Sequence, residues 1–146
     1  MYDAGMTTES RPARILSGLL IISALVTAVY WVDYFVDGHV RTLTAPWYAT
    51  FEDAFPVADG WMAATCLLAG AGLWRGRHWG ALMGLLAGSA LLYLAALDIT
   101  FDINNSLYAL VPSSAQMQFE LLINVWTLAL GIWTVLDCWQ RASVRS

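Results

Sequence analysis

Acidic side chains gather at one end of the long apolar segments of this chain. These carboxylates are Asp33, Asp37, Glu52, Asp53, Asp59, Asp98, Asp102 and Glu120. Most of them fall where a helix would still lie in a lipid bilayer or would just be leaving it. An ionisable group at that depth is costly and is a functional candidate by default. We therefore expect an acidic pocket at one end of a membrane-embedded bundle.

The candidate ligand-binding residues come from four separate segments. Asp33 and Asp37 lie four residues apart, as do Asp98 and Asp102, so each pair shares one side of a helix. Like charges this close repel each other, so a bound cation, bound protons or cationic side chains of the first loop should compensate. The predicted ligand-binding set is Asp33, Asp37, Asp59, Asp98, Asp102, Glu120 and Asn124.

Metal binding is one use of such a pocket. Carboxylate oxygens without thiolates favour a hard cation such as Ca²⁺, Mg²⁺ or Mn²⁺. His39, two residues after Asp37, would turn the pocket into a mixed site suited to Zn²⁺ or iron. The predicted metal ligands are Asp33, Asp37, His39, Asp98 and Asp102. A divalent cation is thus a candidate cofactor, although the chain has no known metal-loop pattern.

General acid–base catalysis is a second use of the pocket. A carboxylic acid in apolar surroundings can hold a proton and donate it near neutral pH. Asp98 and Glu120 are the candidate pair, with Asn124 as a neutral orienting group. Glycine-rich phosphate loops, a G-x-S-x-G elbow and an H-E-x-x-H motif are all absent from the sequence. The reaction class therefore stays open.

The composition is that of a membrane protein. Of the 146 residues, 59% are hydrophobic and 12% are charged, against roughly 45–50% and about 25% in soluble domains. The excess of apolar residues must face lipid, because a soluble chain of this length has too little core to bury them. The net charge of −4 argues against nucleic acid as a partner. We expect a single membrane domain over residues 1–146.

Four apolar segments are long enough to cross a membrane as helices. They predict an all-α, four-helix transmembrane bundle with spans at approximately 15–36, 56–74, 79–101 and 117–139. The turn at 75–78 is so short that the second and third spans should be antiparallel neighbours.

The connections between the spans carry their own signals. Pro46 is a good first-turn residue and predicts a short helix in the first outer loop. Aromatic residues on that helix suit the headgroup layer, and they are Trp47, Tyr48 and Phe51. Ser113 and Gln116 fit an S-x-x-Q capping box that opens the fourth span.

The arginines predict how the bundle is oriented. Six of the seven flank one side of the spans, namely Arg11, Arg14, Arg75, Arg77, Arg141 and Arg145. Only Arg41 lies on the other side. Because cytoplasmic loops carry an excess of Lys and Arg, both termini and the middle turn should be cytoplasmic. The acidic end then faces the extracytoplasmic side of a cell membrane.

Small residues along the spans indicate close helix packing. Gly80, Gly84 and Gly88 are spaced four apart and predict a groove in the third span, into which the second span would pack. Cys66 and Cys138 fall at different predicted depths, so we expect two small apolar fillers rather than a disulfide.

Three sequence features resemble those of small bacterial four-helix membrane proteins of unassigned function. They are Tyr30-Trp31-Val-Asp33, Phe55-Pro56-x-x-Asp59-x-Trp61 and Leu97-Asp98-x-x-Phe101-Asp102. This resemblance covers most of the chain and implies the four-span architecture, but no activity.

A second resemblance is to the EXPERA family of sterol isomerases and sigma-2-type receptors. It rests on Asp33 and on the loop Trp47-Tyr48-x-x-Phe51, and it implies a membrane helical bundle with acids in a lipophilic pocket. The second span lacks the internal Glu or His that isomerase chemistry would use, and the third span has no His. No catalytic residue is therefore transferred from that family.

The leading hypothesis is a polytopic membrane protein that binds a cation, or a small cationic or lipophilic ligand, in its outer acidic pocket. A membrane-embedded acid–base enzyme acting on a lipophilic substrate is one alternative, and a structural or assembly subunit of a membrane complex is another. Membrane lipids are expected partners. A homo-oligomer or a larger membrane complex stays open.

Overall fold

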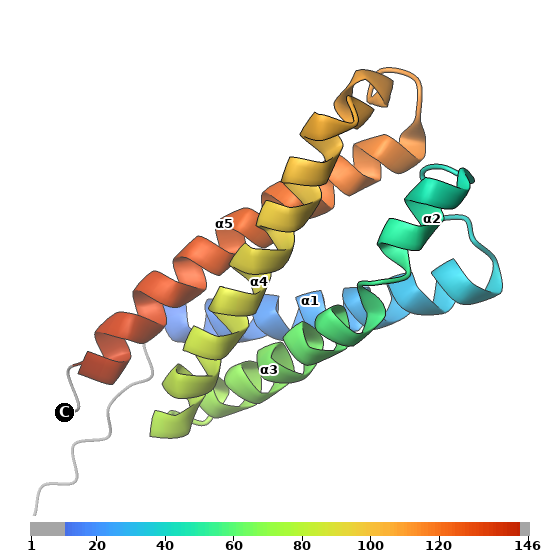
Figure 1. Ribbon diagram of the computed structural model, residues 1–146. Coiled ribbons are helices and arrows are strands. Elements are labelled where there is room, and N and C mark those ends of the chain that lie inside the picture. The colour runs from blue at the N-terminus through green and yellow to red at the C-terminus, as the bar shows by residue number, and fades with distance from the viewer. Residues whose placement is uncertain (1–10, 144–146) are drawn as a thin grey trace, which may run out of the picture.

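The computed structural model describes residues 11–143, and this part of the chain is helical and contains no strand (Figure 1). The four long helices are α1 (Arg11–Val36), α3 (Pro56–Trp74), α4 (His78–Asn104) and α5 (Ala115–Ser143). Two short helices lie in the connections at one end, α2 (Pro46–Glu52) and the 3-10 helix η1 (Leu107–Leu110). The predicted all-α class is confirmed.

The long helices have the length and composition of membrane spans. Four segments are long and apolar enough to cross a bilayer, and they are Arg11–Val36, Pro46–Trp74, His78–Asn104 and Ala115–Ser143. Large apolar side chains cover their outward faces, for example Val29 on α1 and Leu136 on α5. The predicted end of the first span and both ends of the second agree with the structure, because Pro56 opens α3 at its first turn.

The helices pack in series, α1 against α3, α3 against α4 and α4 against α5. The core between them includes Leu16, Leu20, Cys66, Leu91 and Leu130. Both cysteines are free and buried, as the sequence predicts. In Figure 1, α1 and α5 diverge toward the end of the bundle that carries α2 and η1.

A tight turn joins α3 and α4 as antiparallel neighbours. Gly76 adopts a φ of 62°, which a residue with a side chain rarely tolerates, and the Arg77 N–H donates to the Gly72 carbonyl at 2.9 Å. The helices then approach so closely that a Cβ placed on Gly80 would lie 2.5 Å from the backbone nitrogen of Leu73. The antiparallel prediction is confirmed.

The sequence predicts that the second span packs against Gly80, Gly84 and Gly88, and this prediction is wrong for the last two. A Cβ on Gly88 would lie 2.7 Å from Cγ2 of Val135 on α5, and one on Gly84 would meet Cys138 of the same helix. The physical reason is that residues four apart advance by about 40° around an α-helix. The stripe therefore begins against α3 and continues against α5.

The capping residue of α5 differs from the prediction by one position. The Met117 N–H bonds the hydroxyl of Ser114 at 3.2 Å, so Ser114 caps the helix. Ser113 instead donates its hydroxyl to the Leu110 carbonyl. Gln116 makes its contact with Ser114.

The short helix α2 forms where Pro46 predicts it, and it is fixed to α4 by aromatic contacts. Phe51 stacks on Phe101 with 3.5 Å between ring centroids and 2° between ring planes. Tyr48 is buried, whereas Trp47 next to it is half exposed. The inward face of α2 therefore contains Tyr48 and, one turn later, Glu52.

Candidate ligand-binding cavity

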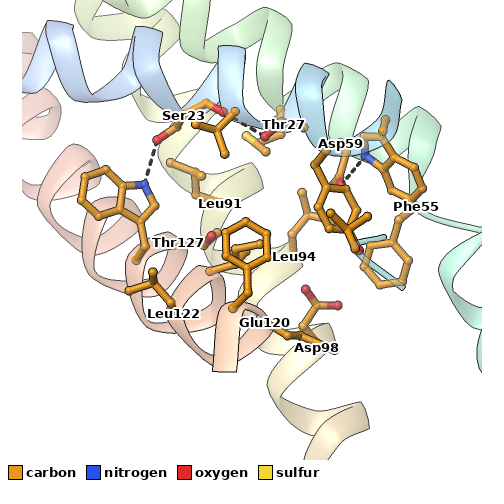
Figure 2. Close-up of a pocket in the computed structure, with 18 of the residues that line it drawn as sticks. Ser23, Thr27, Phe55, Asp59, Leu91, Leu94, Asp98, Glu120, Leu122 and Thr127 are labelled. Carbon is orange, nitrogen blue, oxygen red and sulfur yellow. Dashed lines mark hydrogen bonds between the residues drawn. The ribbon is translucent and has the colours of Figure 1, made fainter. Parts of the chain in front are cut away.

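A cavity of about 460 Å³ lies between α1 and α5, with α3 and α4 behind it (Figure 2). Most of its walls are apolar, including Leu91 and Leu94 of α4. Its edges are apolar side chains that face outward, such as Ile22 on α1 (53% exposed) and Leu122 on α5 (62% exposed). The cavity therefore opens sideways between two helices, in the direction where lipid surrounds a membrane bundle.

One hydrogen bond crosses this opening. The indole N–H of Trp126 on α5 donates to the hydroxyl of Ser23 on α1 at 2.8 Å (Figure 2). Thr27 lies one turn further along α1 and donates to the Ser23 carbonyl. The bond therefore joins two helices that otherwise diverge.

Four carboxylates from four helices line the cavity. They are Glu52 of α2, Asp59 of α3, Asp98 of α4 and Glu120 of α5. Asp98 interacts electrostatically with the other three. No Arg or His contributes to the lining, as far as residues 11–143 define it. The cavity thus gathers carboxyl groups without a cationic side chain of the described residues beside them.

Hydrogen bonds from α1 hold two of these acids in place. Asp59 Oδ2 accepts a bond from the Trp31 indole N–H at 2.8 Å. Glu52 Oε2 accepts one from the Tyr30 hydroxyl at 3.2 Å. These donors belong to α1, so one face of α1 both lines the cavity and orients the acids opposite it.

The other two acids, Glu120 and Asp98, differ in their hydrogen bonding. Glu120 Oε2 accepts hydrogen bonds from the hydroxyls of Thr42 and Tyr48, the latter at 3.2 Å. Asp98 has no hydrogen-bond partner in the described part of the chain. Its carboxylate is therefore the most available for a ligand.

The structure divides the predicted ligand-binding set. It brings Asp59, Asp98 and Glu120 into one cavity. It leaves Asp33, Asp37, Asp102 and Asn124 outside the lining. Glu52, which was not in the predicted set, belongs to the lining and is only 8% exposed. Its spacing of four residues from the inward-facing Tyr48 is the signal that would have found it.

Asp33, Asp37 and His39 form a separate cluster at the end of α1. One ligand atom from each lies within 4.8 Å of the others, and Asp37 and His39 are exposed. The two oxygens of Asp33 contact His39 Nδ1 at 3.2 Å and accept the Val40 N–H at 2.9 Å. Asp33 thereby shapes the loop that follows α1.

The predicted five-residue metal site does not form as one group. Neither Asp98 nor Asp102 belongs to the cluster at the end of α1. The cations of the first loop do not balance the cavity either. His39 contacts Asp33, and Arg41 donates to the Tyr34 carbonyl at 2.9 Å with its guanidinium over the Tyr34 ring.

Asp102 and Asn124 form a buried network with Tyr108 of η1. The Asn124 side-chain nitrogen donates to Asp102 Oδ2 at 2.9 Å and to the Tyr108 hydroxyl at 3.1 Å. Asp102 is 0% exposed, and within the described chain its Oδ1 and that of Asn124 accept no hydrogen bond. Burial raises the pKa of Tyr108 to about 12, so its hydroxyl stays protonated at neutral pH. Asn124 therefore orients Asp102 rather than the predicted pair of Asp98 and Glu120.

This geometry suits a ligand with two parts. Apolar walls can hold a hydrocarbon body, and the carboxylates can accept hydrogen bonds from a cationic head or exchange protons with it. Comparison of the chain with models of protein families, with curated proteins and with solved structures finds no match.

Proposed function

We propose that this chain is a multi-pass membrane protein that binds a lipophilic ligand with a cationic head in the cavity between α1 and α5. One observation carries the proposal. Four carboxylates from four helices meet in an apolar cavity to whose lining the described residues contribute no Arg or His. A volume of about 460 Å³ also falls in the range of small-molecule sites.

Electrostatics favours a cation as the head of the ligand. Carboxylates in a medium of low dielectric repel each other, and a cation among them relieves that repulsion. Tyr30, Trp31 and Trp126 contribute aromatic rings to the same lining, and ring faces attract ammonium groups.

The apolar walls favour an organic cation over a bare divalent ion. A bare ion must shed its hydration shell and gains nothing from hydrocarbon walls. An alkyl chain gains free energy by burial against side chains such as Ile22, Met62 and Leu91. The sideways opening offers that chain a route from the bilayer.

The orientation of the bundle belongs to the same proposal. Five arginines of the described chain lie at the end opposite the cavity, namely Arg11, Arg14, Arg75, Arg77 and Arg141. Arg145, the sixth of the predicted set, lies outside the described residues. The excess of arginine supports a cytoplasmic location for this end. The cavity then lies in the extracytoplasmic half of the membrane.

Titration with matched amphiphiles tests the proposal. Dodecylamine, dodecyltrimethylammonium and dodecanol share an alkyl chain and differ in the charge of the head. With the full chain in nanodiscs of zwitterionic lipid, calorimetry should detect binding of the two cations and weaker binding of the alcohol by about tenfold.

A pair of acidic variants supplies the control. Asp98→Asn removes a cavity carboxylate that has no hydrogen-bond partner among residues 11–143, and it should weaken binding of both cations by about tenfold. Asp37→Asn makes the same change at an exposed acid outside the cavity and should leave affinity unchanged. Equal affinity for the alcohol and the cations, or equal losses in the two variants, would overturn the proposal.

A further inference from the structure

A second cavity lies at the opposite end of the bundle. Its volume is about 300 Å³, and it lies between the α3–α4 turn and the last turns of α5. The polar part of its lining consists of Arg77, His78, Asp137, Gln140 and Arg141. This cavity shares no residue with the acidic one.

The lining of this basic cavity has more cationic than anionic side chains. Its one carboxylate, Asp137, already accepts bonds from Nε and Nη2 of Arg141. A guanidinium has five N–H donors, so Arg141 keeps three donors in a fixed orientation. Arg77 and His78 make no ion pair within residues 11–143. The cavity therefore presents unused donors and net positive charge.

The start of α4 adds to the positive electrostatic potential in the basic cavity. Arg77 is the N-cap residue, and its side chain makes no capping bond. The first amides of a helix carry the positive end of its dipole, although in α4 the Gly80 N–H already donates to the Arg77 carbonyl at 3.0 Å. His78 at the first helical position lines the cavity. Side-chain and backbone charge thus favour an anion in the same place.

We propose that the basic cavity binds the phosphate group of an anionic membrane lipid. Arginine recognises phosphate oxygens through paired N–H donors. Tryptophans flank the lining residues in sequence, and Trp79 and Trp139 are 40% and 66% exposed. Indoles of membrane proteins are enriched at the headgroup layer, and these two lie at helix ends. A phosphate at that depth belongs to a lipid, and basic pockets at a cytoplasmic membrane surface bind such headgroups.

Native mass spectrometry of the full chain measures this binding directly. Dioleoyl phosphatidylglycerol, dioleoyl phosphatidylcholine and dioleoylglycerol share their acyl chains and differ in the head. We expect tightest binding of phosphatidylglycerol. A separate titration with inorganic phosphate distinguishes the sources, because equal affinity for the free anion would overturn the assignment to a lipid.

Arginine variants identify the site. Arg77→Gln and Arg141→Gln should each weaken phosphatidylglycerol binding about fivefold. Arg75→Gln removes the same charge from the same turn but outside the lining, and it should have no effect. Because Arg141→Gln leaves Asp137 without its partner, a double variant with Asp137→Asn separates lost binding from misfolding. An equal loss in Arg75→Gln, or equal binding of phosphatidylcholine, would refute the site.

Discussion

Replacing Gly80 with alanine should separate α3 from α4 and destabilise the bundle. The added Cβ would lie 2.5 Å from the Leu73 nitrogen and 2.8 Å from the Gly72 Cα. Ordinary contact begins at 3.4 Å and the carbonyl carbon of Gly72 is the nearest atom of all, so the helices must move apart by about 1 Å. These neighbours are all backbone atoms and no side chain can rotate away, so the cost falls on helix packing.

The expected loss follows from two opposing contributions. Overpacking typically costs about 1–3 kcal/mol, and the better helix propensity of alanine returns up to about 1 kcal/mol. A net loss of roughly 1–2 kcal/mol lowers the melting temperature by about 2–8 °C for a chain of this size. Gly18→Ala is the matched control, because a Cβ there meets nothing within 4 Å.

The chain carries its own reporter for this measurement. Its two cysteines, Cys66 and Cys138, are both 0% exposed. A maleimide dye should therefore react with them only when the bundle opens on heating. Gly80→Ala should react at a lower temperature than the wild type, and Gly18→Ala at the same or a higher one. A Gly80→Ala variant as stable as Gly18→Ala would show that the close approach of α3 and α4 is not needed.

Two further predictions concern the acidic end and the orientation of the chain. Trp31→Phe removes the N–H donor to Asp59 and should lower the free energy of unfolding by about 1–3 kcal/mol. The control is Trp47→Phe, which changes a half-exposed indole. If both variants melt at the same lowered temperature in the dye assay, this prediction is wrong. A cysteine in place of Ser106 should react with an impermeant maleimide on intact cells, whereas one in place of Arg75 should react only after permeabilisation. Labelling in the opposite order would reverse the proposed orientation.

The sequence predicts the helices well because their signals are local. A run of apolar residues sets the length of each span, Pro46 and Pro56 mark helix starts, and Gly76 marks the tight turn between α3 and α4. The apolar runs reflect the thickness of a bilayer, and the proline and glycine positions act through their own backbone conformation. None depends on where a distant helix lies.

The site is predicted only in part because spacing does not fix which way a helix face points. Asp33 and Asp37 share a side of α1, but α1 turns Tyr30 and Trp31 toward the cavity instead. Asp98 and Asp102 differ by about 40° of rotation and about 6 Å of rise. That difference leaves Asp98 in the cavity and puts Asp102 against α5.

The sideways opening of the acidic cavity determines how the affinity for the proposed ligand should be expressed. A ligand that enters between α1 and α5 arrives from the hydrocarbon phase, so the relevant concentration is its mole fraction in lipid. Diluting a sample with buffer would then leave occupancy almost unchanged, whereas adding empty vesicles would strip the ligand away. Two amphiphiles with the same intrinsic fit would rank by how strongly each one partitions into membranes.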